Sequence, residues 1–431
     1  GLSALVQLIG CLMTVLILLY SLRYIPRHLS DENQTPGKLS NYYGLLLVFL
    51  GMLNFTCITN HMVLLYLSVE AATLVTALLV VFYRRREALE AGYKYLVLVG
   101  VGVTFALLGC VFLYSGGLQV LPPAEALLLS SLGRVAKHLP TGVALLAAAF
   151  LVAGFGTKAG LMPFHAWLPD AHSEAPTPIS ALLSAVVIKI GAYALARTIT
   201  VLAPYFGAIT LFLAILASVG MLLGVLLAWA QDDLKRLLAY HSVSQMGYIV
   251  EGLGLGTYLG VYGGLFHLLN HTLFKALLFM AVGAIMFATG GIRRISRLGG
   301  LGKKMPVTAV CFFIGALAMG GVPLLNGFMS KLTLFMAVAE KQLLWAAVVG
   351  MVTSTLTLAC LAHAAYRVFW GEAPEDDPDV EEATEAPPTL LGAMIVLAAL
   401  CFVIGMYPQV VHPVLDTATR CVMQALGGAT H

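Results

Sequence analysis

Residues 141–164 read TGVALLAAAFLVAGFGTKAGLMPF, and this stretch sets the interpretation of the rest of the chain. It is apolar and long enough to cross the roughly 30 Å hydrocarbon core of a bilayer, yet it contains Lys158 and Pro163. Proline removes a backbone donor and clashes with the preceding turn, so a helix formed by this stretch should break. The sequence therefore predicts a membrane-spanning helix that is interrupted beside a buried charge.

A second apolar span has the same character. Residues 320–331 read GGVPLLNGFMSK, so that glycines and a proline again precede a lysine, Lys331. Either interruption alone could be an ordinary kinked helix. Interrupted spans at corresponding places in two halves of a chain indicate an inverted-repeat transporter whose ion path lies at the breaks. We expect breaks near 158–163 and near 320–327.

The composition also indicates a membrane protein. Of 431 residues, 60% are hydrophobic and 10% are charged, and the mean hydropathy is +0.91, whereas a soluble domain carries about 25% charged residues. The net charge of +3 is small and the basic residues lie in short loops, which argues against a nucleic-acid partner. Apolar runs long enough to span a bilayer fall at 2–22, 42–59, 61–83, 93–115, 141–164, 178–201, 206–230, 236–254, 258–289, 307–338, 342–369 and 389–407. We expect an all-α polytopic membrane protein with about 12 transmembrane helices.

The loops between these runs predict the orientation and the division of the chain. Loops 23–41, 84–92, 165–177, 231–236, 290–306 and 370–388 carry most of the Lys and Arg residues, which places them in the cytoplasm. We expect the chain to lie in the inner (cytoplasmic) membrane of a prokaryote. We divide the chain into a leading helix and cytoplasmic loop (1–41), two inverted-repeat halves (42–201 and 206–369), an acidic loop (370–388), and a last helix with a C-terminal tail (389–431). The acidic stretch Glu372–Glu385 is expected to be a solvated loop.

Motifs for other chemistry are missing from the sequence. The seven cysteines are scattered through apolar runs without metal-binding spacing and are interpreted as small core residues. No GxGxxG fingerprint, P-loop or GxSxG elbow occurs, so we expect no cofactor in this chain and assign any redox centre to partners. The chain begins at Gly1 inside an apolar run, without a signal peptide, and an N-terminal piece is expected to be missing.

Charged side chains inside the spans are the candidates for function. Four lysines, Lys158, Lys189, Lys275 and Lys331, lie well inside predicted spans, and Glu70 is interpreted as the only carboxylate deep in one. A charge at mid-membrane costs at least about 2.5–3.5 kcal/mol, so these groups should face water or each other. Burial disfavours the charged form of a lysine and a nearby carboxylate favours it, which suits proton relay. Snorkelling to the headgroups is the alternative, better suited to Lys275 or Lys94.

Histidines extend this set. His267, His271 and Lys275 are spaced by four residues and share one face of a helix, which favours a hydrogen-bonded relay over structural histidines. Bis-histidine haem ligation would need His363 on a facing helix, and nothing around His363 supports it. His61, His165 and His241 lie at span ends near water. Four residues are candidates for proton uptake or release, namely His165, His172, Lys235 and His241, and His172 with Glu174 could equally cap a loop.

Three motifs resemble a known family. They are GTKAGLMPFHAWLPDAHSEAP at 156–176, SALLSAVVIKIGAY at 180–193 and DLKRLLAYHSVSQMGY at 233–248. These runs closely resemble the antiporter-like subunits, which include the proton-pumping membrane subunits of respiratory complex I, the large subunits of Mrp-type sodium/proton antiporters, and the membrane subunits of energy-converting hydrogenases and formate hydrogenlyases. The resemblance covers essentially the whole chain.

The resemblance implies a role for each buried group. Glu70 resembles the glutamate of the family's fifth helix, which pairs with the lysine of the broken seventh helix, here Lys158. Lys189 resembles the lysine at the centre of the proton path, His267 and His271 match the histidine-bearing eleventh helix, and Lys331 resembles the charged residue of the broken twelfth helix that opens to the outer face. The family fold has fourteen helices with two inverted five-helix repeats, so two leading helices are expected to be absent here.

The resemblance also implies partners. We expect other antiporter-like and small membrane subunits, peripheral redox subunits that hold Fe–S, Ni–Fe or flavin groups, and lipid. The leading hypothesis is a proton-translocating subunit of a complex I-like or hydrogenase-like complex, without a redox centre of its own. Sodium/proton exchange in an Mrp-type assembly is the alternative, although sodium needs several oxygen ligands, and a structural, non-pumping subunit is a third. The run GVPLLNGFMSK at 321–331 most resembles hydrogenase or other complex I-like oxidoreductase relatives.

Overall fold

Helices make up nearly all of the structure, a computed structural model that describes residues 1–30, 36–372 and 378–427, with no β-strand in these ranges. The first half contains α1 (Leu2–Ser30), α2 (Pro36–Ile58), α3 (Met62–Val80), α4 (Arg86–Gly117), α5 (Leu129–Val135), α6 (Thr141–Ala159), α7 (Trp167–Glu174), α8 (Thr177–Leu182), the π-helical η3 (Leu183–Val187) and α9 (Ile188–Ile199). The second contains α10 (Phe206–Trp229), α11 (Leu234–Gly254), α12 (Tyr258–Ala288), α13 (Pro306–Gly320), α14 (Asn326–Glu340), α15 (Leu344–Phe369), α16 (Pro378–Glu381), α17 (Pro388–Met406) and α18 (His412–Ala425). The all-helical membrane class is confirmed.

The number of spans stays a prediction. Within the described ranges, nine helices are long and apolar enough to cross a membrane. One of them is the continuous stretch Thr177–Trp229, which bends at the 3-10 helix η4 (Thr200–Tyr205), where Leu202 leaves helical geometry. That stretch corresponds to two of the predicted spans. Helix α11 and the α13–α14 pair, which were also predicted to span, are not among the nine helices.

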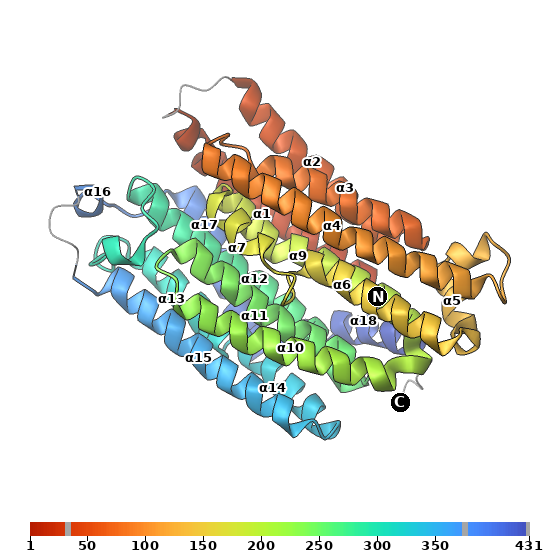
Figure 1. The fold of residues 1–431 in the computed structure, drawn as a ribbon. Coiled ribbons are helices and arrows are strands. Elements are labelled where there is room, and N and C mark those ends of the chain that lie inside the picture. The colour runs from red at the N-terminus through yellow and green to blue at the C-terminus, as the bar shows by residue number, and fades with distance from the viewer. Residues whose placement is uncertain (31–35, 373–377, 428–431) are drawn as a thin grey trace.

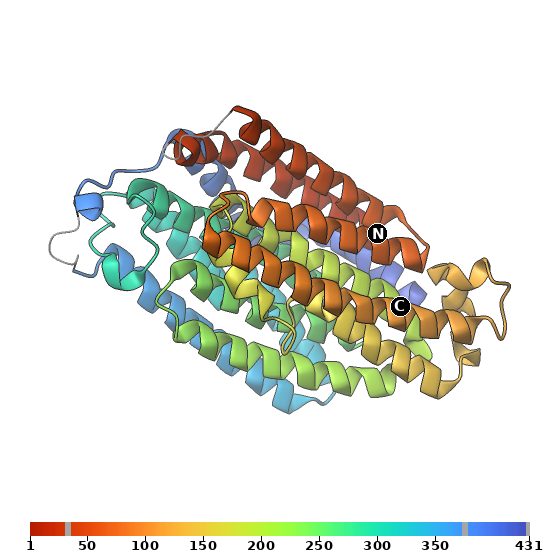
Figure 2. The ribbon, with the colours of Figure 1, turned by 45° about the horizontal axis from the view of Figure 1, so that its top comes forward.

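The helices lie side by side along one common direction (Figures 1 and 2). In Figure 1, α2, α3 and α4 form one edge, α14 and α15 form the opposite edge, and the almost fully buried α12 lies between them. The segment around α5 lies at one end of the bundle and α16 lies at the other. Gly1 packs against Thr417 and Ala418 of α18, so the first residue and this last helix meet at the same end, as an even number of spans would require.

The first predicted break is confirmed. Helix α6 ends at Ala159, Gly160 adopts a left-handed conformation with φ of 71°, and α7 begins only at Trp167. The amide of Leu161 donates to the Gly156 carbonyl, which closes the helix end in the manner of a Schellman motif. The glycine is needed because the left-handed conformation places the Cβ of other L-residues too close to the following carbonyl oxygen.

The second break has the same construction. Helix α13 ends at Gly320, Gly321 has φ of 81°, and the Val322 amide donates to the Leu317 carbonyl, before α14 begins at Asn326. A Cβ at Gly327 would lie 1.8 Å from the Ala318 carbonyl oxygen, so only glycine lets the two half-helices approach this closely. Both interruptions therefore end in a left-handed glycine within the bundle.

The described part of the acidic stretch is solvated only in part, because Glu372, Asp379, Glu381 and Glu382 are exposed as expected while other residues dock onto the bundle. Val380 is buried, and the Nζ of Lys304 donates to the Val380 and Glu381 carbonyls at 2.8 Å each. Glu385 accepts from the amides of Val307 and Thr308, which caps the start of α13. Composition did not indicate this because the docking depends on distant contacts: two backbone carbonyls, a helix cap, and the buried side chains of Val380, Ala383 and Ala386. Residues 31–35 of the first predicted loop, 373–377 of the acidic loop and 428–431 of the tail lie outside the described residues.

Two cysteines also depart from the predicted core role. Five are buried, namely Cys57, Cys110, Cys311, Cys360 and Cys401. Cys11 and Cys421 are exposed. Cys11 lies on a face of α1 with the exposed Leu8 and Val15. An apolar residue in a membrane protein can face lipid as readily as it can pack in the core. The sequence pattern cannot separate these two environments.

Candidate functional site

Lys189 lies at the centre of the buried polar groups. Its Nζ atom contacts Nδ1 of His271 at 2.5 Å and donates to the carbonyl of Ser184 at 2.5 Å. That carbonyl lies in the π-helical segment η3, whose wider turn changes the hydrogen-bond partners of the backbone just before Lys189. The lysine is 1% exposed, so a titratable amine is held in the interior by one carbonyl and one imidazole.

The two histidines of α12 carry the polar contacts onward. The rings of His267 and His271 lie 6.4 Å apart on the same face, as their spacing predicts. His267 contacts Oγ of Ser330 at 3.0 Å through Nδ1 and Oε1 of Gln245 at 3.2 Å through Nε2. Ser330 immediately precedes Lys331 on α14. A row of polar side chains thus runs from Lys189 to the second broken helix.

Met319 connects the remaining two lysines of the second half. Lys331 donates through Nζ to the Met319 carbonyl at 2.7 Å and to Oγ of Ser354 at 2.9 Å. Lys275 places its Nζ 3.6 Å from the sulfur of the same Met319 and 5.8 Å from the centre of the Phe279 ring. Lys275 is fully buried, which contradicts the alternative that it snorkels to the headgroups. Lys94, by contrast, is a surface residue that contacts Glu90 and Asp170.

Lys158 occupies a separate polar cluster beside the first break. Its Nζ donates to Oγ1 of Thr73 and to Oη of Tyr95, both at 2.8 Å. Glu70 lies one turn before Thr73 on α3 and faces Gly100 of α4. An ion pair requires a nitrogen–oxygen distance of at most 4.0 Å, and the Lys158 Nζ and the Glu70 carboxylate do not meet it within the described chain. The direct pairing implied by the resemblance is therefore not made in this structure.

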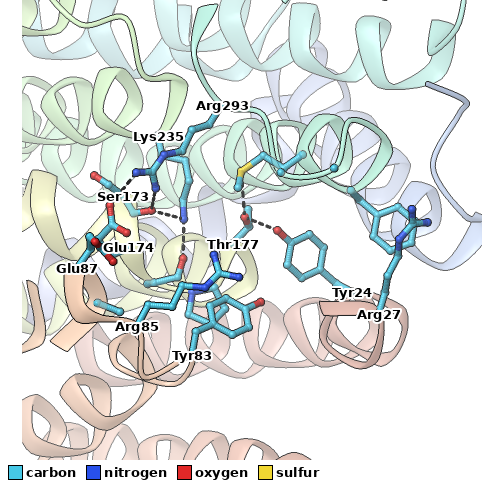
Figure 3. A pocket seen from close by; sticks show the side chains of 17 residues that line it. Tyr24, Arg27, Tyr83, Arg85, Glu87, Ser173, Glu174, Thr177, Lys235 and Arg293 are labelled. Atoms are coloured by element: carbon cyan, nitrogen blue, oxygen red, sulfur yellow. Dashed lines mark hydrogen bonds and ion pairs between the residues drawn. The ribbon is translucent and has the colours of Figure 1, made fainter. Parts of the chain in front are cut away.

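The predicted cytoplasmic end contains a cavity of about 570 Å³ (Figure 3). Its lining includes Tyr24, Arg85, Glu174, Lys235 and Arg293, which come from segments far apart in the sequence. The Nζ of Lys235 donates to the Ser173 and Ala175 carbonyls at 3.1 and 2.6 Å. Lys235 is 1% exposed, so it is a buried member of the cavity lining.

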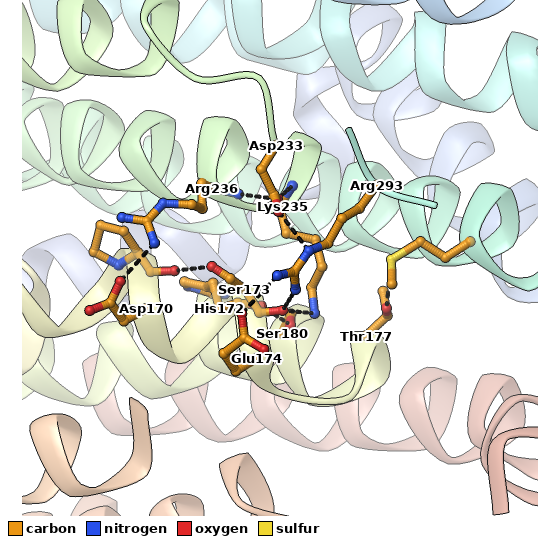
Figure 4. A network of polar contacts seen from close by, with 12 residues as sticks. Asp170, His172, Ser173, Glu174, Thr177, Ser180, Asp233, Lys235, Arg236 and Arg293 are labelled. Atoms are coloured by element: carbon orange, nitrogen blue, oxygen red, sulfur yellow. Dashed lines mark hydrogen bonds and ion pairs between the residues drawn. The ribbon is translucent and has the colours of Figure 1, made fainter. Parts of the chain in front are cut away.

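Ion pairs hold this end together (Figure 4). Arg293 pairs with Glu174 at 2.8 Å and with Asp233 at 2.7 Å, and it donates to the Ser173 carbonyl. Although burial lowers the pKa of the Arg293 guanidinium, these two carboxylates outweigh the effect and raise its pKa. Glu174 is therefore engaged in an ion pair rather than open for proton uptake.

His172 and His241 lie deeper than the sequence predicted. The region 165–177 is largely the short helix α7, and His172 on it is fully buried against Phe279, with ring centres 4.7 Å apart. His241 is fully buried on α11, which contradicts its predicted place near water, because neighbouring helices cover the first turns of α11. Neither imidazole has a hydrogen-bond partner within the described part of the chain. His165 and His61 are partly exposed, as expected.

Glu251 was missed as a buried carboxylate. It lies in the last turn of α11, is 2% exposed, and has one oxygen without a hydrogen-bond partner among the described residues. Because Glu251 lies near the end of its helix, it does not change the interpretation of Glu70 as the carboxylate deep in a span. A residue so near a helix end is predicted to reach water, and its burial depends on α14 and α15, which the local sequence does not reveal.

The predicted groups fall into two sets. Lys189, His271, His267 and Lys331 form one row, whereas the cluster around Lys158 has no hydrogen-bonded link to Lys189 within the described residues. Where α6 meets α9, a Cβ at Gly191 would lie 2.7 Å from the Lys158 carbonyl carbon, so backbones pack closely there. No group of three His, Cys, Asp or Glu that could hold a metal ion occurs among residues 1–30, 36–372 and 378–427.

Comparisons with known proteins agree with this architecture. The model of the family described as NADH:quinone oxidoreductase/Mrp antiporter, TM, matches residues 59–357. NADH-quinone oxidoreductase subunit N of Desulforudis audaxviator is 34% identical over 90% of this chain and 78% of its own, and a hydrogenase-4 component F homolog of Methylacidiphilum infernorum is 34% identical over 84% and 76%. A chain in the structure of the Mrp complex from Dietzia sp. superposes with a TM-score of 0.84 at 25% identity, covering 99% of this chain and 85% of that one.

Proposed function

Because this chain belongs to the NADH:quinone oxidoreductase/Mrp antiporter transmembrane family, we propose that it carries protons across a prokaryotic inner membrane. In this proposal it acts as one membrane subunit of a redox-driven complex, and the redox centres belong to partner subunits. The relatives named for a quinone oxidoreductase and a hydrogenase support the redox part. The buried groups of this chain support the proton part.

The contact between Lys189 and His271 is the observation that carries the proposal. Two titratable nitrogen atoms lie 2.5 Å apart in a fully buried place. A lone ammonium there would cost several kcal/mol, whereas a lysine and an imidazole that share a proton can hold it and pass it on. Continuation through His267 to Ser330 supplies the next polar partners.

The polar groups suggest a direction of travel. Protons would enter from the cytoplasmic cavity, pass Lys235 and the buried His172, and reach Lys275 across the ring of Phe279. His271, which contacts Lys189 and lies four residues before Lys275 on α12, would feed His267, and Lys331 would receive the proton before release. Sodium transport would instead need several oxygen ligands gathered in one place, and this row consists of ammonium and imidazole groups.

Lys189 provides the test. We expect Lys189→Met to reduce proton uptake by vesicles that contain the purified complex by at least about tenfold, as loss of a proton-transfer group does. Lys189→Arg should fail too, because arginine does not release its proton. The matched control is Lys94→Met, which removes an exposed lysine. Full transport by both Lys189 variants, with assembly intact, would refute the proposal.

The partners need a separate measurement. We expect redox subunits to co-purify with the full chain after mild solubilisation, and mass spectrometry identifies them. A set composed only of small antiporter subunits would favour the Mrp-type alternative, while leaving the proton path unchanged.

A further inference from the structure

Glu251 is a buried acid that the proposed path does not use. It lies in the last turn of α11, 2% exposed, and its Oε1 atom has no hydrogen-bond partner among the described residues. It makes no ion pair within the described chain. A structural role for a buried carboxylate normally depends on such partners.

The surroundings of Glu251 are apolar. Tyr248, three residues earlier, packs with Ala217, Met221 and Leu334. Leu255, four residues later, packs with Ala337, Val338, Ala346 and Ala347. Residues three and four apart share a helix face, so Glu251 lies between these two apolar clusters, where α10, α14 and α15 meet α11. Apolar surroundings disfavour an ionised carboxylate.

Glu251 lies just beyond Lys331. The Nζ of Lys331 is 5.0 Å from the centre of the Tyr248 ring, and Leu334, one turn after Lys331, packs against Gly252. Helices α11 and α14 therefore run side by side in the same sense. Glu251 occupies the level one turn past Lys331, toward the end of the bundle that the loop charges predict to be outside.

We propose that Glu251 is a second carboxyl proton site, which receives the proton from Lys331 and releases it to the outer aqueous phase. The inference rests on the proposed function. In the step, an N–H bond of the Lys331 ammonium breaks and an O–H bond forms on Glu251, through an intervening water, leaving a neutral amine and a neutral carboxyl group. The O–H proton then passes to water outside, and the carboxylate is restored.

Two substitutions separate this role from packing. Glu251→Gln keeps the size and removes the titration, and we expect proton transport by the purified complex to fall at least about tenfold. Glu251→Asp keeps the carboxyl group and should recover part of it. The control is Glu340→Gln, which removes an exposed carboxylate at the end of α14 on the same predicted side and should leave transport unchanged.

Two further readouts exclude misfolding. The Glu251→Gln complex should unfold at the same or a higher temperature than the parent, because it loses an unpaired buried acid. Infrared difference spectra should lose the band of a protonated buried carboxyl group in Glu251→Gln alone. Normal transport by Glu251→Gln, in a preparation where Lys189→Met is inactive, would overturn this inference and leave the proposed function standing.

Discussion

Each buried lysine of the two clusters is held by neutral groups. Lys158 contacts two hydroxyl groups, Lys189 contacts a carbonyl and an imidazole, and Lys331 contacts a carbonyl and a hydroxyl. Neutral partners solvate an ammonium group but do not fix its charge as a carboxylate would. A lysine held in this way can lose its proton without leaving an unpaired buried anion.

Glu70 gives a prediction at this scale. If its charge attracts the proton on Lys158, then Glu70→Gln should lower proton transport strongly, at least about tenfold, whereas Glu70→Asp should retain part of it because the charge survives. A packing role predicts the opposite order, since glutamine matches the size of glutamate. Transport assays on the two variants give the rank order, and a harmless glutamine beside a damaging aspartate would disprove the coupling.

Single residues were predicted unevenly. The four lysines were found because a charge inside a long apolar run is visible in the sequence. His241 was placed near water and Glu251 was not identified, because both lie toward the ends of a predicted span and their burial is caused by neighbouring helices. The sequence shows how far a residue lies from the ends of its own helix, but it does not show which neighbouring helices cover that residue.

The breaks give a prediction at the scale of elements. Gly321→Ala should destabilise the protein by about 1–2 kcal/mol because a left-handed residue with a Cβ is strained, and the added atom would lie 3.1 Å from Cδ of Lys331. Gly392→Ala in α17, where no atom lies within 4 Å, should be neutral or stabilising by about 0.5–1 kcal/mol. Thermal unfolding of the solubilised complex compares the two. Equal stability of both variants would mean that the break tolerates a side chain.

Elements differ in how far the sequence reveals them. Glycine and proline identified both interruptions, since these residues act on the backbone directly. The π-helical segment η3 was not predicted, because Leu183–Val187 contains neither residue. The Ser184 carbonyl within it accepts a hydrogen bond from Lys189. The docking of Glu385 onto α13 was equally invisible, because it depends on a partner about 77 residues away.

The orientation of the whole bundle gives the last prediction. With Cys11 and Cys421 changed to serine, a membrane-impermeant maleimide applied to intact cells should label Gln119→Cys and spare Lys303→Cys, since the positive loops should be cytoplasmic. Both positions are exposed, one after α4 and one before α13. Labelling of Lys303→Cys in sealed cells would reverse the orientation and, with it, the assigned direction of proton travel.

The two left-handed glycines place helix C-terminal ends in the middle of the bundle, each beside a lysine. Lys158 lies in the last turn of α6, and Nζ of Lys331 contacts the Met319 carbonyl in the last turn of α13. Aligned peptide dipoles give such an end about half a negative charge. For Lys331, the backbone itself thus acts as a permanent, non-titratable counter-charge, one that no proton can neutralise.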